Sequence, residues 1–461
     1  LSLVLALVMT MSLVTVSAGA KDFTDSEDLS GEAYAEAVNV MSEMGIIDGY
    51  AGGDFRPQGT LTRQAAAKII ACMILGKTTA ESLGTSAAPF KDVPAGSSFA
   101  GYIAFCVERG LIDGYADGTF RPTGTLTGFA FLKMLLGALG YDSSIEGYTG
   151  PNWTVNVAGR AYEIGLTAGN DEFVGAQACT REQAALYAVN TLKTTLVEYT
   201  DRGSEITVNG AVISTAASVP TYVTSSVYNQ ATSINADRDN SGDYTVEFAE
   251  RYQPDLTMDR DTDDFGRPSY TWAWKNRDIG TYVDYSLMVA EYTTGVSGRE
   301  LYNVLTASTI RNADLDVYVD GVEPDEADTI DKSDLSRSNQ DDVGVTDNGV
   351  LTQVFVDTDA NDGDGLITIA SINTWLAQAT ANYSESKEYA PLKVFTGKGG
   401  ANTTYNVDVE DVANVADVAD EAFYLVNISY KDSNRGEVVA IQDAEVMEDS
   451  TVTKWSSDDD L

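Results

Sequence analysis

The pattern of apolar and polar positions divides the chain near residue 200. Before that point, apolar residues recur every three or four positions in successive stretches, which is typical of amphipathic helices. After it, apolar and polar residues alternate in runs rich in Val, Tyr, Thr and Ile, which is typical of half-buried strands. The sequence therefore predicts a helical N-terminal region and a β-rich remainder.

The helical region repeats one unit. Residues 45–57 read GIIDGYAGGDFRP, and residues 110–122 read GLIDGYADGTFRP. Each stretch follows a predicted helix, with a Phe-x-Asp motif further upstream, and Leu-Thr opens a second predicted helix downstream. A third unit keeps both helices around Gly165, but its turn has diverged to GLTAGNDEFVGAQA. Helix, glycine turn, loop and helix thus recur over 21–78, 88–141 and 147–198.

The start of the last helix in this region carries its own signal. Thr180 is followed three positions later by Gln183, which is the spacing of a capping box. We therefore expect the helix to begin directly after Thr180.

The β-rich remainder is expected to form two modules, 203–325 and 350–461, of sandwich-like or α+β type. The run at 243–252 is among the predicted strands, and 325–349 is predicted as a loop or linker. Two hairpins with acidic loops are expected, at 356–370 and 430–442, and one helix is expected over Ala370–Tyr383.

Residues 1–20 contain no charged side chain and end in Ala18-Gly19-Ala20. An apolar run that closes on such a site predicts a secretory signal peptide, which is removed from the mature protein. A membrane-spanning helix is the alternative, although the small residues at the end favour cleavage. Without an initiator Met or a basic segment, the printed start is expected to be truncated. We expect an exported protein with no membrane span in its mature form.

Composition narrows the possible functions. The net charge of −41 argues against nucleic acid as a partner, because phosphate binding needs a basic surface. The chain has no His, which excludes Ser-His and Cys-His catalysis and His-bound zinc. Its three Cys have no spacing typical of disulfides or zinc sites, so we expect small buried side chains. Enzymes that use only carboxylates, such as glycosidases, remain possible.

The charge is also uneven along the chain. Residues 21–200 hold 21 acidic and 12 basic side chains, whereas 201–461 hold 49 and 17. This asymmetry indicates two regions with different roles.

The repeated motifs resemble S-layer homology (SLH) domains over about residues 22–196. The similar marks are Phe-x-Asp, the Gly-Ile-Ile-Asp-Gly-Tyr to Phe-Arg-Pro turn, and Thr-Arg at the start of the second helix. The resemblance implies a multidomain protein with a compact, all-α, pseudo-threefold domain of three units before the β-rich modules. It also implies binding to the secondary polysaccharide of Gram-positive cell walls, which often carries pyruvylated amino sugars.

The resemblance further implies which residues contact the polysaccharide. A pyruvyl carboxylate suits the planar donors of Arg and the N-terminus of a helix, and a sugar face suits an aromatic side chain. Arg63 and Arg181 match the Thr-Arg position, and Trp153 matches the Trp that starts the first helix. The full set of candidates adds the two capping threonines and four turn residues: Thr62, Thr180, Arg56, Arg121, Asp117 and Gly118.

The sequence departs from the family pattern at several of these positions. Gly128 replaces the Arg in the second unit, and Gly52 replaces the Asp of Asp-Gly in the first. Ala33 and Ser98 stand at the Trp position, beside Tyr34 and Phe99. We therefore expect one or two of the three grooves to bind.

Structural roles are the alternative for several candidates. Arg56 and Arg121 would then hold their loop against a neighbouring unit, and Trp153 would be buried. The aromatic residues of the two turns are expected to be core side chains beneath the glycines: Tyr50, Phe55, Tyr115 and Phe120.

Acidic loops that begin at Asp237, Asp259 and Asp357 offer oxygen ligands at alternating positions. None completes an EF-hand, because Phe248 and Thr368 occupy position twelve of loops in which Asp237 and Asp357 are position one. They are either solvated loops or weak calcium sites, and no cofactor is required.

Together these features predict a non-enzymatic protein of the cell wall or S-layer of a Gram-positive-type bacterium. Its helical region would bind wall polysaccharide non-covalently, and its acidic region would self-assemble into a layer or display a binding surface. An anchored polysaccharide hydrolase with a carboxylate pair and an anchored adhesin are the alternatives.

Overall fold

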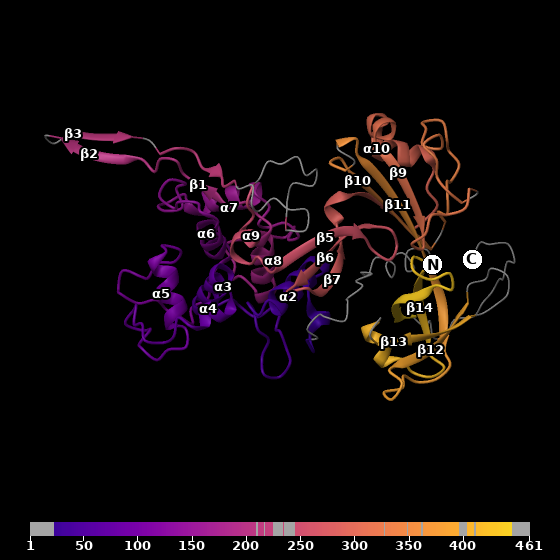
Figure 1. Cartoon of the computed structure of the whole chain (residues 1–461), viewed down its shortest axis with the longest axis horizontal. Helices are drawn as coiled ribbons and strands as arrows, with labels where there is room; N and C mark the ends of the chain where they lie inside the picture. Colours follow the sequence, from indigo (N-terminus) through magenta and orange to yellow (C-terminus); the bar gives the residue numbers. More distant parts are fainter. Residues whose placement is uncertain are drawn as a thin grey trace.

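The structure is a computed structural model that describes residues 23–208, 211–215, 217–224, 234, 245–326, 328–347, 349–360, 363–395, 403–409 and 412–444. The expected segment 1–20 and the loop from Asp237 lie outside these residues. Helices gather at one end of the molecule and the largest sheet at the other, with strands β5–β7 between them (Figure 1). The predicted order of a helical region followed by a β-rich region is confirmed.

The helical region consists mainly of two helices from each unit. A short 3-10 helix, η1 (Ser26–Asp28), precedes them, and α4 (Lys77–Glu81) extends the first unit. The six main helices are α2 (Glu32–Glu43), α3 (Arg63–Leu75), α5 (Ala100–Glu108), α6 (Gly128–Leu139), α7 (Trp153–Glu163) and α8 (Arg181–Leu192).

A threonine caps the second helix of each unit. The hydroxyl oxygens of Thr62, Thr127 and Thr180 accept from the backbone N–H three residues later, at 3.3, 3.3 and 3.2 Å. Thr180 and Gln183 form the predicted capping box, because the Gln183 side chain also accepts from the Thr180 backbone at 3.1 Å. Each cap satisfies a backbone donor that the helix itself cannot pair.

The segments before these helices bond to one another in a closed cycle. The Leu61 N–H donates to the Cys179 carbonyl (2.8 Å), the Cys179 N–H to the Leu126 carbonyl (2.9 Å), and the Leu126 N–H to the Leu61 carbonyl (2.9 Å). The three side chains are buried in a common core. The units therefore close on each other rather than extend as a linear array.

The three cysteines are free and buried, as predicted. Burial raises the pKa of the Cys72 thiol to about 11 and that of the Cys106 thiol to about 12. Both are small core side chains and not reactive thiolates.

The Phe-x-Asp motif holds the glycine turn of the first two units. In the first, the Asp25 carboxylate accepts from the backbone N–H of Phe55 and of Arg56, both at 2.7 Å. The Phe23 and Phe55 rings lie 5.2 Å apart, and Phe55 is buried as predicted. Asp92 does the same in the second unit, where it accepts from Phe120 and Arg121.

Two predictions for these turns differ in outcome. Phe120 is buried, as expected, under the second turn. The expectation that Tyr50 and Tyr115 are core side chains is wrong, because they are 43% and 41% exposed. The tight turn places each tyrosine on its outer side, where an arginine covers the ring.

Two small antiparallel pairs and one three-stranded sheet follow the helices. The strands are β1 (Val197–Glu198), β2 (Ser204–Val208), β3 (Ala211–Thr215), β4 (Thr221–Tyr222), β5 (Leu256–Thr262), β6 (Pro268–Trp274) and β7 (Arg277–Val283). The strand expected over 243–252 is wrong in its described part. There a capping box between Glu247 and Glu250 starts the short helix α9 (Phe248–Tyr252).

The three-stranded sheet packs on the helical region. Leu256, Met258 and Trp272 belong to the same core as the helices. The Glu36 carboxylate of α2 accepts from the Trp272 indole N–H at 2.8 Å and from the Tyr270 hydroxyl at 3.0 Å. This sheet therefore shares its interior with the helices.

The turn between β5 and β6 reaches the C-terminal sheet. Arg267 is 1% exposed, pairs with Asp263 (Nη2 to Oδ2, 2.6 Å) and donates to Gln353 at 3.2 Å. Lys431 donates to the Thr262 carbonyl at 2.7 Å. Strands β5–β7 thus connect the helical region with the C-terminal sheet.

Within the described residues, the C-terminal sheet has eight strands, all antiparallel to their neighbours except β9, which is parallel to β11. They are β8 (Met288–Tyr292), β9 (Asp314–Val319), β10 (Val350–Asp357), β11 (Leu366–Ala379), β12 (Tyr389–Phe395), β13 (Thr403–Asp408), β14 (Phe423–Ser429) and β15 (Glu437–Asp443). Short 3-10 helices η2 (Tyr285–Leu287) and η4 (Ala413–Asp417) lie beside it. The two predicted hairpins are confirmed as β10–β11 and β14–β15.

The helix expected over Ala370–Tyr383 is wrong, because β11 runs through most of it. This long strand pairs with β9, β10, β12 and β14, so tertiary pairing overrides the helical pattern. A helix that the sequence did not indicate, α10 (Gly298–Asn312), starts instead at a capping box between Ser297 and Glu300.

The sheet does not follow the expected division into modules 203–325 and 350–461. Strands β8 and β9 pair with β10 and β11 from the other side of the predicted linker. The described part of that linker has neither helix nor strand, but Ile330, Leu335 and Val343 are buried against α10 and the sheet. No described helix is long and apolar enough to span a membrane.

Candidate functional site

Arg63 starts α3 in the first unit and lies against the turn of the second unit. Its Nε donates to the Phe120 carbonyl (2.8 Å), its Nη2 donates to the Asp113 carbonyl (2.7 Å), and its guanidinium covers the Phe120 ring at 4.5 Å. Burial lowers the pKa of Arg63. No carboxylate among the described residues forms an ion pair with it. Arg63 therefore presents a positive charge without an ion-paired carboxylate in the described part of the chain.

A cavity of about 340 Å³ opens beside Arg63 and is lined by all three units. Lys133 from α6 and Trp153 from the start of α7 line it together with Arg63, and Gly150 adds backbone. The Lys133 ammonium lies 6.0 Å from the Trp153 ring centre, and both side chains are half-buried. The fold thus brings Arg63 and Trp153 together across 90 residues of sequence.

Sequence reasoning missed Lys133. It lies five positions after Gly128 in α6, and Lys68 lies five positions after Arg63 in α3. A lysine at the same position of two units was the signal in the sequence that could have identified Lys133 as a candidate.

A second junction places Arg181 on the turn of the first unit in the same way. Its Nε and Nη2 donate to the carbonyls of Phe55 and Asp48, both at 2.8 Å. Lys68, which corresponds to Lys133, pairs here with the Asp48 carboxylate at 2.8 Å. Ser98 stands where the first cavity has Trp153. This junction therefore offers one cation, Arg181, that has no ion pair with a described residue, and no aromatic platform at that position.

The third junction has neither cation. Gly128 replaces the arginine, and a Cβ there would lie 3.1 Å from Phe173 and 3.3 Å from the Cα of Gly175. Leu186 occupies the lysine position and Ala33 the tryptophan position. Loop atoms of the third unit thus fill the space that an arginine would use.

The turn residues Arg56 and Arg121 are on the surface. Each adopts a left-handed backbone conformation (φ 60° and 57°), and each guanidinium covers a tyrosine ring, Tyr50 at 4.0 Å and Tyr115 at 3.8 Å. Arg56 also pairs with Asp54. These pairs form exposed arginine–tyrosine stacks outside the cavity beside Arg63.

Asp117 and Gly118 shape the second turn. The Asp117 carboxylate accepts from the hydroxyl and the backbone N–H of Thr119, at 2.6 and 3.0 Å, and these bonds lower its pKa to about 2. It also pairs with Arg121 at 3.3 Å. Gly118 has a φ of 78°, a conformation that suits glycine.

The hydroxyl oxygens of Thr62 and Thr180 are occupied by their helix caps. They help to fix the helix N-termini from which Arg63 and Arg181 project. Their structural position is thus beside the candidate arginines rather than inside the cavity.

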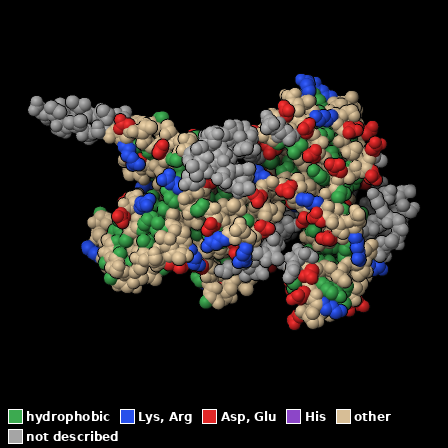
Figure 2. Space-filling model, in the orientation of Figure 1, with side chains coloured by type: hydrophobic (Ala, Val, Ile, Leu, Met, Phe, Trp, Pro, Cys, Tyr) green, Lys and Arg blue, Asp and Glu red, His purple; other side chains and the backbone are tan. Residues whose placement is uncertain are grey.

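The acidic loops lead to no metal centre in the part of the chain that the structure describes. There, no group of three or more acidic or Cys side chains is arranged to hold a metal ion. The segment that begins at Asp259 lies partly in strand β5. Acidic side chains gather on the C-terminal half of the face shown in Figure 2.

Comparisons with known proteins support the resemblance. The family model of the S-layer homology domain matches residues 22–67 and 89–132, which are parts of the first two units. The prediction of three repeats is therefore confirmed for two of them. The match covers the turns with Arg56 and Arg121 and the start of α3 with Arg63.

Several curated proteins are similar to this chain. A surface layer protein of Brevibacillus choshinensis is 24% identical over 208 residues, 45% of this chain and 18% of that protein. A cellulosome-anchoring protein of Acetivibrio thermocellus is 37% identical over 82 residues, 18% of each chain. An endoglucanase of a Bacillus species is 36% identical over 110 residues, 23% of this chain and 12% of the enzyme.

The matched segments span less than a fifth of each of these relatives. With the S-layer homology match, they indicate a secreted protein associated with the cell wall or cell surface.

Proposed function

We propose that the helical region binds an anionic secondary polysaccharide of the cell wall and thereby anchors the chain without a covalent bond. The observation that carries this proposal is the cavity in which Arg63, Lys133 and Trp153 meet. An arginine without an acidic partner suits a carboxylate, and an aromatic ring suits the apolar face of a sugar. A pyruvyl group on an amino sugar presents both features in one residue.

The second groove, with Arg181, is a weaker site of the same kind in this proposal. Its arginine makes the equivalent carbonyl contacts, but Asp48 already neutralises Lys68. The third junction has no cation at either position and does not bind the polymer.

The arrangement of the units supports a pseudo-threefold domain as part of this proposal. The cyclic hydrogen bonds among Leu61, Leu126 and Cys179 relate the three helix starts in turn. Such an arrangement places one groove at each junction between units.

The β-rich region, in this proposal, forms the outer layer or displays a binding surface, and the protein is not an enzyme. Its excess of carboxylates would keep neighbouring copies apart unless cations screen them. We therefore expect any self-assembly into a layer to depend on salt or divalent cations.

The anchoring proposal is tested by co-sedimentation of the full chain with purified wall that retains its secondary polymer. The double variant Arg63→Ala, Arg181→Ala should lose sedimentation by at least tenfold, because both grooves lose their anion donor. A matched control is Arg109→Ala, Arg277→Ala, which removes the same charge at exposed sites. Equal binding to wall stripped of the polymer would contradict the assigned ligand.

A separate experiment tests whether the pyruvyl carboxylate of the polymer is recognised. Mild acid removes pyruvyl groups from the polymer, and we expect the treated polymer to bind at least tenfold more weakly. Unchanged affinity would show that Arg63 does not recognise that group.

The hydrolase remains the second candidate because a relative is named as an endoglucanase. Incubation of the chain with wall polysaccharides should release no soluble sugar. Release that depends on a carboxylate of this chain would overturn the non-enzymatic proposal.

A further inference from the structure

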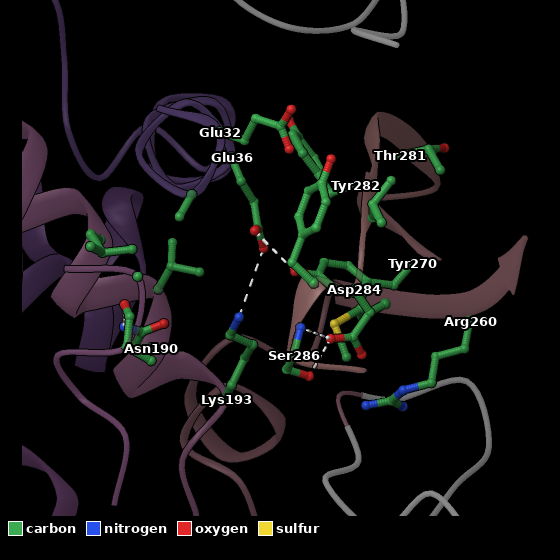
Figure 3. A pocket seen from close by; sticks show the side chains of 18 of the residues that line it. Glu32, Glu36, Asn190, Lys193, Arg260, Tyr270, Thr281, Tyr282, Asp284 and Ser286 are labelled. Carbon is green, nitrogen blue, oxygen red and sulfur yellow. Dashed lines mark hydrogen bonds and ion pairs between the residues drawn. The ribbon is translucent and has the colours of Figure 1, made fainter. Parts of the chain in front are cut away.

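A larger cavity, of about 520 Å³, lies between helices α2 and α8 and the sheet β5–β7 (Figure 3). Its volume is in the range of pockets that hold small organic ligands. Ala33, Ala168 and Leu186 line its helical side. By the repeat alignment they correspond to Trp153, Asp113 and Lys133 of the first cavity. The third junction therefore lacks the residues of an anion-binding groove and instead has a cavity that strands of the same chain cover.

The lining of this cavity is acidic and aromatic. Five carboxylates and two cations line it: Glu32, Glu36, Asp171, Asp263, Asp284, Lys193 and Arg260. Three of the carboxylates are committed to structural contacts, and one of them, Asp284, accepts from the backbone N–H and the hydroxyl of Ser286. Asp263 pairs with Arg267, and Glu36 accepts from Trp272 and Tyr270 and lies 3.8 Å from the Lys193 ammonium. Glu32 and Asp171 are the remaining carboxylates of the lining, and their negative charge favours a cationic ligand.

Glu32 is the carboxylate best placed to receive such a ligand. It starts α2 and is half-buried, and burial raises the pKa of its carboxyl. The Tyr285 side chain and the positive charge of Arg267 oppose this rise in the pKa. No Lys or Arg of the described chain forms an ion pair with Glu32. In Figure 3 it lies at the opposite side of the pocket from Lys193.

The other lining groups suit an organic cation with hydroxyl groups. The rings of Tyr270, Tyr282 and Tyr285 line the cavity, and aromatic faces attract ammonium groups. Thr281 and Ser286 add hydroxyls. A metal ion fits less well, because the described acidic side chains nowhere converge as a group of three that could hold one.

We propose that this cavity binds an amino sugar with a free, protonated amine, which pairs with Glu32 while tyrosine rings contact the sugar. This site differs from the proposed anchoring grooves in its position, its residues and the sign of its charge. It would give the chain a second saccharide specificity, for sugars that lack the acetyl group on nitrogen.

A matched pair of ligands tests the proposal on the full chain. The trisaccharide of glucosamine and that of N-acetylglucosamine differ only in acetylation, so the first carries ammonium groups and the second does not. In calorimetric titrations at pH 6, we expect the glucosamine trisaccharide to bind at least tenfold more tightly. Equal affinity for both sugars, or binding of neither, would overturn the proposal.

Variants locate the binding. Glu32→Gln keeps the shape of the side chain and removes its charge, and should weaken glucosamine binding at least tenfold with an unchanged unfolding midpoint. Glu108→Gln, at an exposed position of α5, is the matched control and should bind normally. Unchanged binding by Glu32→Gln contradicts the site. Asp171→Asn, on the exposed rim, should weaken binding less than Glu32→Gln and provides a second test if the first variant unfolds early.

Two further measurements distinguish this site from the anchoring grooves and from a site for a peptide amine. Glu32→Gln should sediment with wall polymer as the unaltered chain does, so failure of the anchoring proposal is seen independently. A lysine-rich peptide that binds in place of glucosamine, with the same dependence on Glu32, would assign the cavity to a peptide amine and overturn the sugar.

Discussion

Two junctions between the helical units occupy equivalent positions in the predicted repeat but have different surroundings. At the junction that holds Arg63, the side chains of Arg63, Lys133 and Trp153 line an open cavity of about 340 Å³. At the third junction, the corresponding lysine and tryptophan positions hold Leu186 and Ala33, and β5–β7 cover them. The junction that lacks both cations is thus the one that packs against β5–β7. Two junctions of the same repeat can thus differ in whether other strands of the chain cover them.

We expect the largest effect on stability from a substitution that disrupts the interface between β5–β7 and the helices. Glu36→Ala leaves the Trp272 indole N–H and the Tyr270 hydroxyl without their acceptor. We expect the free energy of unfolding to fall by about 3 kcal/mol, because these buried donors lose their partner. Urea unfolding measures this change. Glu108→Ala, at an exposed position, should change stability by less than about 0.5 kcal/mol. An equal effect of the two variants would show that Glu36 does not hold the sheet.

Substitutions in the cavity beside Arg63 should change the affinity for the polymer rather than the stability of the fold. Trp153→Ala removes the aromatic platform and should weaken polymer binding about tenfold, or ~1.4 kcal/mol. The unfolding midpoint should change little, since Trp153 is only half-buried. Titration of the polymer and a urea melt separate these effects. A large loss of stability with unchanged affinity would assign Trp153 to the core.

Gly128→Ala sharpens the comparison at the third junction. The new methyl would lie 3.1 Å from Phe173, but alanine also favours the helix over glycine. These effects oppose each other, so the change in stability should be below about 1 kcal/mol. Polymer binding should stay within about twofold of the unaltered chain. A clear loss of sedimentation would mean that this junction also binds the polymer.

The smallest effect is expected from pH at the exposed turn. The pKa of Asp117 is lowered to about 2 by the Thr119 hydroxyl and backbone N–H. Its ionised form therefore stabilises the folded state above the ordinary Asp pKa of about 4, and this contribution is lost as the pH falls from about 4 to 2. Thermal melts of Asp117→Asn and the unaltered chain should differ at pH 6 and converge at pH 2. A constant difference would exclude Asp117 as the titrating group.

Local signals predicted much of the helical region. The threonine caps, the capping box at Thr180 and the buried Phe55 and Phe120 depend on residues close in sequence, and the structure bears them out. The exposed Tyr50 shows the limit of such signals. Whether a turn aromatic faces inward depends on the backbone of the folded loop, which composition does not reveal.

The β-rich region was predicted less well, because its strands pair over long distances. Ala370–Tyr383 has a pattern that also suits a helix, and neighbouring strands decide the outcome. In the same way, β8 and β9 join the sheet of β10 and β11 across the expected linker. The division into modules could not be read from composition.

The sequence by itself predicted three helical units, two of which the S-layer homology model matches, and the helix start at Thr180, and it singled out Arg63, Arg181 and Trp153 as candidate binding residues. Only the tertiary structure decided which of these share a cavity, that Lys133 joins them, and that β5–β7 cover the third junction. The physical reason is distance along the chain. Caps and glycine turns form between near neighbours, whereas a cavity and a packed interface arise only when segments far apart in sequence come together.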